Sequence, residues 1–330
     1  MTAPVDDAAV VFAELGDLEK EFAQVELDAL RRKEYALKPL YSKRETLLNS
    51  VPDFWPTVFG NGPEEIQQFL SPDDLALISV ITSFSVERYQ IESETAGEPR
   101  SLRFTFEFAE NEFIEDRKVV KEFEYKPRED GPGSLVSRPV LIKWKGKKKD
   151  VTHGLLGAAV ELYAAEEALR LKNGETEIDI VERESLWQHE KLREQLVKLD
   201  ESPELEPSFF NWFGFRGAVK TAYPKKAGED RANGAEDDED EDEEPMLEVE
   251  IFPAGEEFAI ALAEEVWPDA MDYFMSAQEE SSSSSEVNGI LVDDGEDSSE
   301  DDDVPELVEG EIAPEVEAED ARPRKRQRNV

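Results

Sequence analysis

The sequence predicts an α+β fold in which a long N-terminal helix precedes an antiparallel sheet covered on one face by helices. Apolar residues recur every three or four positions through the first 50 residues, as in an amphipathic helix, and alternate with polar ones from Leu102 to Phe108, as in a strand. Beyond residue 276 the chain is acidic and serine-rich, which opposes a packed core. We therefore expect a helix over 1–50, an α+β domain over 51–275 and a disordered acidic tail over 276–330.

The N-terminal helix is expected to begin at Pro4 and to end before Pro52, since proline suits the first helical turn and disfavours helix in the residue before it. At a rise of about 1.5 Å per residue it spans roughly 65 Å. A helix longer than its domain leaves much of its apolar stripe uncovered. The spacing favours pairing with a second copy, and packing along its own domain is the alternative.

The middle of the chain has the spacing of a sheet followed by helices. Turn residues and short connections between the apolar segments favour an antiparallel meander. Besides Leu102–Phe108, the expected strands are Ile81–Ile91, Val119–Tyr125 and Val140–Trp144. Short helices are expected around Ile66 to Leu75, with Ser71–Asp74 as a cap, and longer ones at Leu155–Leu171, Leu186–Leu199 and Phe258–Phe274.

Charge predicts the kind of partner. The chain has 80 Asp plus Glu against 37 Lys plus Arg, a net charge of -43, which attracts cationic molecules and repels nucleic acid phosphate. An unbroken acidic run at Glu236–Glu244 lies in an expected solvated loop at about 228–245. No apolar run approaches the roughly 20 residues that span a bilayer, and residues 1–10 lack a signal pattern. We expect a soluble intracellular protein with a basic partner and no membrane contact.

Catalysis has little support in the sequence. The chain has no cysteine, only two histidines (His153 and His189), and no glycine-rich phosphate loop. Carboxylate pairs occur throughout so acidic a chain, and such pairs are usually solvated surface. We predict no catalytic residue, no metal site and no cofactor.

Two other segments stand out against the acidic background. Ser208–Phe215 concentrates aromatic residues and is expected in the core rather than as an exposed anchor. The other is a basic segment of five lysines around and after Trp144. If the segment starts as a strand, its first two lysines face solvent while Trp144 packs inward. It is either a solvated hairpin end or a contact for phosphate, as in DNA, or for an acidic tail. Its members are Lys143, Lys145, Lys147, Lys148 and Lys149.

The tail contains two further kinds of signal. Its last basic cluster fits a nuclear import signal, and a charge clasp onto the acidic tail is the alternative. Serines beside acidic residues fit an acidophilic kinase, and each phosphate would add about -1.5 to -2 charge. The basic residues are Arg322, Arg324, Lys325, Arg326 and Arg328, and the serines are Ser281, Ser282, Ser283, Ser284, Ser285, Ser298 and Ser299.

Five motifs in order support a family resemblance. They are Leu37–Glu45 followed by Val51–Trp55, then Phe106–Phe113, Ile142–Lys145, Ser208–Phe213, and Val266–Pro268 through Tyr273–Phe274. Together they cover most of residues 10–275 and resemble the nucleosome assembly protein family, in particular its SET or template-activating-factor branch. Glu112 replaces a proline common in the family, which affects the local turn only. The segment 154–206 is longer and more helical than expected for that branch.

What the resemblance implies is a nuclear histone chaperone, with shuttling to the cytoplasm left open, built as a homodimer with one earmuff domain per protomer. The preferred pair of core histones is also left open. By analogy the dimer would be held by Val11, Leu15, Leu18, Phe22, Val25, Leu30, Leu37 and Tyr41. Histone contacts would come from the concave underside and the acidic segments, including Glu107, Glu110, Glu112, Asp237, Asp238, Asp240 and Asp242.

Two other functions remain open at this point. One is a regulatory protein that inhibits a phosphatase or masks histones from acetylation, a role also associated with the SET branch. The other is a nonspecific acidic solubiliser whose folded domain is incidental. Equal binding of polylysine and core histones would favour the second.

Overall fold

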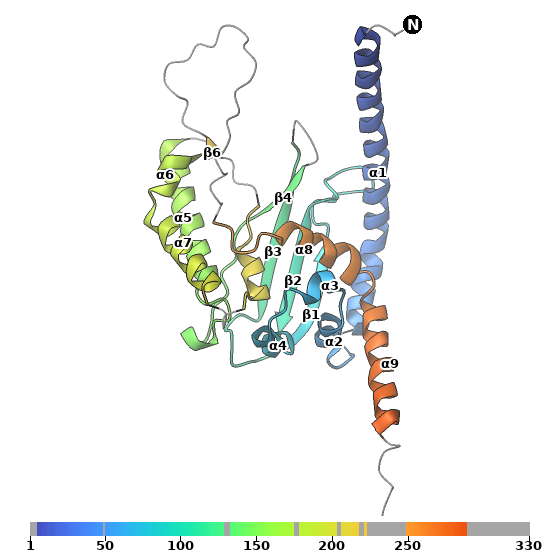
Figure 1. The fold of residues 1–330 in the computed structure, drawn as a ribbon. Coiled ribbons are helices and arrows are strands. Elements are labelled where there is room, and N and C mark those ends of the chain that lie inside the picture. The colour runs from blue at the N-terminus through green and yellow to red at the C-terminus, as the bar shows by residue number, and fades with distance from the viewer. Residues whose placement is uncertain are drawn as a thin grey trace, which may run out of the picture. The chain divides into compact units, whose positions relative to one another are not determined.

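The computed structural model describes residues 5–48, 50–128, 133–174, 178–202, 206–217, 221–222 and 249–288. It divides into a compact unit over 1–284 and a second unit over 285–330, of which only the helical residues 285–288 are described. The first unit begins with helix α1 (Val5–Leu48), which confirms the predicted N-terminal helix. Figure 1 shows α1 beside the β1 edge of a sheet.

The sheet has four antiparallel strands in the order β1-β2-β3-β4, which confirms the predicted meander. The register pairs Phe84 with Phe106, and Phe104 with Lys121, across neighbouring strands. A separate short pair, β5 and β6, is parallel. The bounds are β1 (Ile81–Glu87), β2 (Leu102–Phe108), β3 (Lys118–Lys126), β4 (Ser134–Ser137), β5 (Ile178–Asp179) and β6 (Thr221–Ala222).

The prediction of a strand at Val140–Trp144 is wrong, because β4 lies before it. Pro139 separates the two segments and has no backbone N–H for a ladder, so the strand ends ahead of it. The Val140 N–H instead donates to the Phe213 carbonyl at 2.8 Å. Trp144 forms only an isolated bridge with Ile114.

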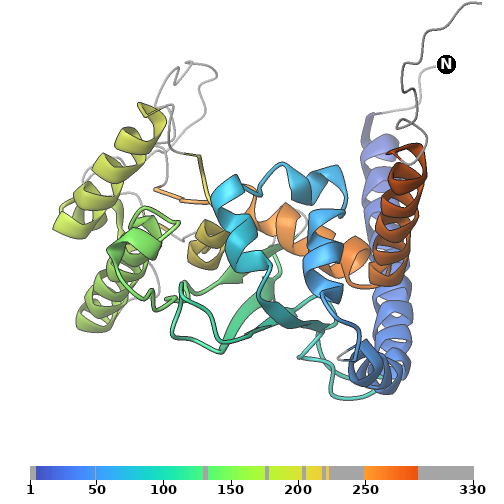
Figure 2. The same ribbon diagram turned by 90° about the horizontal axis from the view of Figure 1, so that it is seen from below.

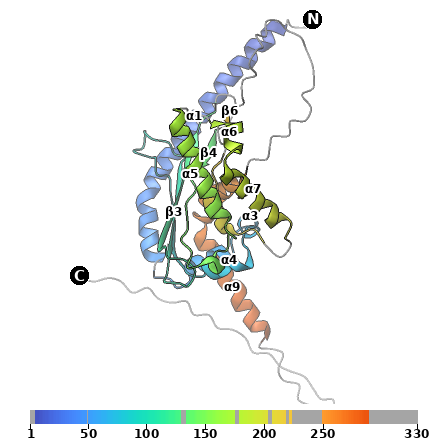
Figure 3. The same cartoon turned by 90° about the vertical axis from the view of Figure 1, so that its left-hand side faces the viewer.

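Helices cover one face of the sheet, as predicted (Figure 2). Ser71 and Asp74 form a reciprocal capping box at the start of α4, which confirms the predicted cap. Beyond the β4 edge, α5 and α7 pack side by side (Figure 3). The bounds are α2 (Phe54–Gly60), α3 (Glu64–Gln67), α4 (Pro72–Ile78), α5 (Leu155–Asn173), α6 (Ile180–Glu184), α7 (Trp187–Asp200) and α8 (Gly255–Ala261), with the short 3-10 helices η1 (Lys147–Lys149) and η2 (Phe209–Gly214).

The C-terminal helix differs from the prediction in its middle and at its C-terminal end. The expected single helix Phe258–Phe274 is divided into α8, a π-helical turn η3 (Leu262–Val266) and α9 (Ala270–Asn288). Pro268 lies at the break, where its ring is incompatible with a continuous helix. Residues 276–288, which we expected to be disordered, continue α9. This stretch has no glycine or proline until Gly289 and therefore lacks a helix breaker.

The core consists of aromatic side chains packed between the sheet and these helices. Residues 208–215 are all buried, which confirms their predicted core position. Trp212 lies at the centre, with ring centroids 5.1 Å from Phe104 and 5.3 Å from Phe123. Its indole N–H donates to the Gly255 carbonyl at 3.0 Å, which satisfies the one polar atom of a fully buried ring.

Candidate functional site

The uncovered face of the sheet, which we call the open face, is a surface of paired charges. Arg103 on β2 is central: its guanidinium contacts Glu87 on β1 at 3.2 Å and Glu122 on β3 at 2.7 Å. Lys38 from α1 reaches Glu87 at 2.6 Å. These side chains are 35% to 58% exposed, so water competes for every pair. The open face consists of Glu87, Arg103, Thr105, Glu107, Lys118, Val120, Glu122 and Glu124.

The three predicted domain carboxylates cluster at one end of the open face, where β2 ends. Glu107 contacts Lys118 at 3.0 Å, and Glu110 contacts Arg117 at 3.2 Å. Glu112 accepts a hydrogen bond from Lys149, and this bond lowers the pKa of the Glu112 carboxyl. The side chains of Glu110 and Glu112 are 84% and 71% exposed. They are accessible to a cationic partner that displaces the local lysine or arginine.

The basic segment lies next to these carboxylates. The Lys145 ammonium donates to the Asn111 carbonyl at 2.6 Å, while Lys147 and Lys148 are exposed and have no ion-pair partner among the described residues. Trp144 is half-buried against Phe210, as expected. The structure therefore brings the predicted phosphate contact and the predicted acidic contact together, because Lys149 pairs with Glu112.

Helix α1 has two different halves. From Val11 to Val25 the five predicted dimer residues are 45% to 67% exposed, which leaves an apolar stripe uncovered. Leu30, Leu37 and Tyr41 are half-buried. The Tyr41 ring packs on Trp267 of the same chain, with centroids 5.3 Å apart. The alternative of packing along its own domain therefore holds for the second half of the helix and not for the first.

A buried ionic network lies beneath the sheet edge, and no pattern in the sequence indicated it. Glu166 on α5 is 2% exposed and accepts hydrogen bonds from Arg183 at 2.7 Å and from Arg216 at 2.6 Å. Burial raises the pKa of Glu250, whose carboxylate also accepts from the Arg216 backbone N–H. We use the name buried network for Lys121, Glu166, Arg183, Arg216 and Glu250.

Lys121 is the most enclosed member of this network. Its ammonium donates to the carbonyls of Arg138, Phe213 and Phe215 at 2.9, 3.0 and 2.7 Å. Burial lowers its pKa well below the ordinary value, although nearby Glu250 acts in the opposite direction. In the alternation of β3, Lys121 occupies an inward position, between the buried side chains of Val119 and Phe123. Only the tertiary placement of three carbonyls explains a lysine there.

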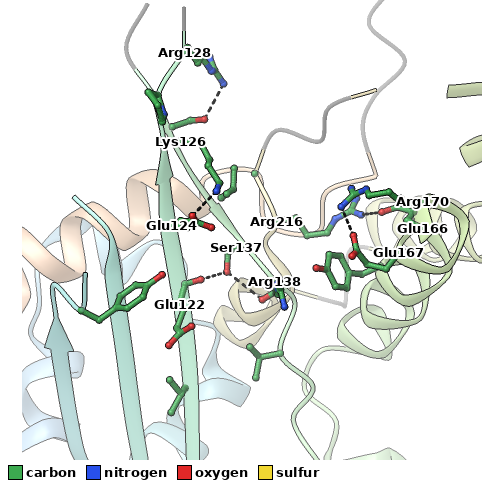
Figure 4. Close-up of a pocket in the computed structure, with 18 residues that line it drawn as sticks. Glu122, Glu124, Lys126, Arg128, Ser137, Arg138, Glu166, Glu167, Arg170 and Arg216 are labelled. Carbon is green, nitrogen blue, oxygen red and sulfur yellow. Dashed lines mark hydrogen bonds and ion pairs between the residues drawn. The ribbon is translucent and has the colours of Figure 1, made fainter. Parts of the chain in front are cut away.

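A cavity of about 1080 Å³ lies between the sheet edge and α5, and we call it the α5 cavity (Figure 4). One wall comes from β3 and β4 and contains Glu122 and Glu124. The opposite wall contains Arg170 from α5 together with Arg216. In Figure 4 the labelled arginines and carboxylates of the two walls face a common space. The cavity is therefore polar and bounded by charges of both signs.

Several predicted sites lie outside the described residues. These include the acidic loop at 228–245 with Asp237, Asp238, Asp240 and Asp242, the kinase sites Ser298 and Ser299, and the import cluster Arg322–Arg328. Ser281–Ser285 lie in α9, where the backbone is helical. Within the described ranges, no group of three or more acidic or histidine side chains is arranged to hold a metal ion. No helix in this part of the chain is long and apolar enough to cross a membrane.

The chain is similar to several known proteins, some of them named for nucleosome assembly. It is 22% identical over 309 residues to vacuolar protein sorting-associated protein 75 of Saccharomyces cerevisiae, covering 90% of this chain and 89% of that one. It is 31% identical over 152 residues to a Schizosaccharomyces pombe relative whose name refers to nucleosome assembly, and 32% identical over 111 residues to NAP1-related protein 2 of Arabidopsis thaliana. These two matches cover 43% and 34% of this chain but only 60% and 39% of the relatives.

The fold is also similar to that of a solved structure. The crystal structure of Vps75 superposes with a TM-score of 0.51 at 22% identity, and the match covers 82% of this chain and 99% of that one. The model of the nucleosome assembly protein (NAP) family matches residues 19–277, which is well over half of the chain and includes most of α1, the sheet and the start of α9. The chain therefore belongs to the nucleosome assembly protein family.

Proposed function

We propose that this protein is a histone chaperone that binds basic core histones and promotes nucleosome assembly or disassembly. Family membership supports the class of function. The structural observation that supports it most directly is the group of exposed carboxylates at the end of β2, since Glu110 pairs with the exposed Arg117 and Glu112 with the half-buried Lys149 of the same chain. A histone lysine or arginine can replace such a cation at little cost, because water and salt compete with ion pairs at the surface.

The proposed mechanism is competitive shielding. Carboxylates of the open face and of the acidic tracts cover histone cations that would otherwise contact DNA nonspecifically, and they release the histones when DNA offers the better site. Exchange of one ion pair for another needs no ATP. Binding should weaken as salt rises, because exposed charges are screened beyond about 8 Å at physiological ionic strength.

We also propose that the protein is a homodimer held by the first half of α1. The support is the exposed stripe that includes Leu18 and Phe22, since large apolar patches on a soluble protein mark an interaction surface. The double variant Leu18→Glu/Phe22→Glu should sediment as a monomer, whereas Glu19→Gln on the same helix should remain a dimer. A wild-type protein that sediments as a monomer at micromolar concentration would contradict this proposal.

The remaining functional assignments follow from the same model. Lys143, Lys145, Lys147, Lys148 and Lys149 would provide a weak contact with DNA beside the histone site. The cluster Arg322–Arg328 would direct import into the nucleus, and phosphorylation of Ser281–Ser285, Ser298 and Ser299 would add negative charge. Replacing Lys147 and Lys148, which have no ion-pair partner among the described residues, by glutamine should reduce DNA retention at low salt with little change in histone affinity, because the pair between Lys149 and Glu112 stays intact.

Analytical ultracentrifugation with purified histones tests the main proposal. The full chain should bind the tetramer-forming pair, the dimer-forming pair or both, with an affinity that falls across a salt series. A chain that ends at Asn288 keeps α9 and removes the later acidic tracts, so it separates the folded surface from the tail. Loss of all binding when Glu107, Glu110 and Glu112 become glutamine in that shorter chain would assign the site. Failure of the full chain to bind either pair would refute the proposal.

A further inference from the structure

Every carboxylate in the walls of the α5 cavity is paired with a cation, but not every guanidinium group there has all its donors paired. Each acidic side chain in the wall already contacts a cation. Glu122 contacts Arg103 at 2.7 Å, and Glu167 contacts Arg170 at 2.6 Å. Glu124 pairs with Lys126, and Glu166 holds two arginines of the buried network. The wall therefore has little acidic capacity left for a basic ligand.

Arginine donors in the same wall remain unsatisfied. The Arg216 side chain is only 5% exposed, yet its Nη2 has no hydrogen-bond partner among the described residues. Nε of Arg170 also has no hydrogen-bond partner in the described part of the chain. Arg138 is exposed and contacts no carboxylate in the described residues. A buried charged donor without an acceptor is costly, so an anionic ligand at this place would be stabilising.

We propose that the α5 cavity binds an acidic peptide segment through Arg138, Arg170 and Arg216. Guanidinium groups pair with carboxylates in a planar, bidentate way. The cationic side chains extend along the cavity, from Lys126 and Arg128 at the β3 end to Arg170 on α5, rather than converging on one point as around a small anion. A volume of about 1080 Å³ also exceeds the needs of a single ion and accommodates several residues.

The occupant we propose is the chain's own acidic run Glu236–Glu244, which is complementary in charge and follows Arg216 by 20 residues in the sequence. An acidic segment of a different protein is the outcome that the test below distinguishes from it. This segment differs from a histone in the sign of its charge, so the α5 cavity is a site for a second kind of ligand. It borders the open face, with which it shares Val120, Glu122 and Glu124.

A binding measurement with a labelled nonapeptide of the sequence Glu236–Glu244 tests the proposal. The protein has a net charge of -43, which repels this peptide, so binding at physiological salt requires a local cationic site. The same peptide with glutamine and asparagine in place of its acids should not bind. Arg138→Glu and Arg170→Gln should each weaken binding by about tenfold or more, as expected for the loss of a charge-assisted hydrogen bond.

Lys118→Glu is the matched control, because it makes the same change of charge as Arg138→Glu on the open face and outside the cavity. It should alter the affinity less than about twofold. The full chain is compared with one in which residues 236–244 are replaced by glycine and serine. Peptide binding should become tighter after the replacement, because the chain's own run no longer competes for the cavity. Equal binding would overturn the assignment of the occupant to residues 236–244. No binding to either chain, or equal loss in Lys118→Glu and Arg138→Glu, would overturn the proposal.

Discussion

The open face and the buried network use the same ion-pair chemistry at opposite degrees of exposure. Arg103 joins two carboxylates across the surface of three strands, and its side chain is 35% exposed. Glu166 joins two arginines in the interior, where its side chain is 3% exposed. Water and salt can replace a partner of Arg103 but not one of Glu166. The comparison indicates that the surface pairs are exchangeable, as partner binding requires, and that the buried pairs hold α5 and α6 to the rest of the domain.

The largest effect should come from breaking the buried network. Glu166→Gln keeps the side chain's shape but leaves Arg183 and Arg216 without their shared carboxylate. Removing one partner of a buried ion pair typically costs about 3 to 5 kcal/mol. Denaturant unfolding should show this loss. Glu167→Gln, one residue away on α5, removes a pair whose side chains are about one-third exposed and should cost less than about 1 kcal/mol. Equal effects of the two variants would contradict the comparison.

The pH dependence of stability should have opposite signs in the two regions. Burial raises the pKa of Glu250 above its ordinary value of 4.5, so the folded state binds its proton more tightly than the unfolded chain does. The Glu250 contribution therefore makes unfolding easier as pH rises from 4.5 through the raised pKa. Burial also acts to raise the pKa of Glu87, but Lys38 and Arg103 together lower it, so its contribution is lost as pH falls below 4.5.

Urea unfolding of Glu250→Gln and Glu87→Gln at a series of pH values measures these contributions. Relative to wild type, Glu250→Gln should gain most in unfolding free energy above the raised pKa. Glu87→Gln should lose unfolding free energy at neutral pH and match wild type more closely below 4.5. The same sign for both variants would show that exposure does not separate the two regions.

The smallest change in stability should come from the open face, although binding should change there. Arg103→Ala should alter the free energy of unfolding by less than about 1 kcal/mol, because its pairs are exposed. It also frees Glu122 for an external cation, while Glu87 keeps its pair with Lys38, so histone binding at low salt should become tighter. Sedimentation or fluorescence titration checks this, with Arg193→Ala on exposed α7 as the control. Weaker histone binding by Arg103→Ala would exclude the open face from the site.

Much of the fold could be predicted because its pattern is local. The spacing of Val11 to Val25 and the alternation of Leu102 to Phe108 determine a helix and a strand through periods of 3.6 and two residues, and both occur as expected. The errors at Val140–Trp144 and after residue 276 concern ends of elements. Pro139 ends the strand early, and the absence of a helix breaker before Gly289 lets the helix continue. The prediction relied on composition and took account of neither.

The candidate sites could also be predicted only in part. Exposed carboxylates such as Glu110 and Glu112 are evident from a chain with so large an acidic excess. The sequence also showed that Lys149 belongs to a basic segment, but it could not show that Lys149 pairs with Glu112, 37 residues away. Contacts at such separations depend on how strands and loops are brought together. Periodicity does not encode this.

By itself, the sequence determined most of the element types, the aromatic core segment at 208–215 and the acidic charge excess on which the proposed basic partner rests. Tertiary structure decided which half of α1 stays exposed, which carboxylates are exchangeable and where arginines line a cavity. The physical reason is that periodicity and composition are sums over neighbouring residues. The energy of a charge depends on its burial and on partners brought from distant segments, as with Lys121 and the carbonyls of Phe213 and Phe215.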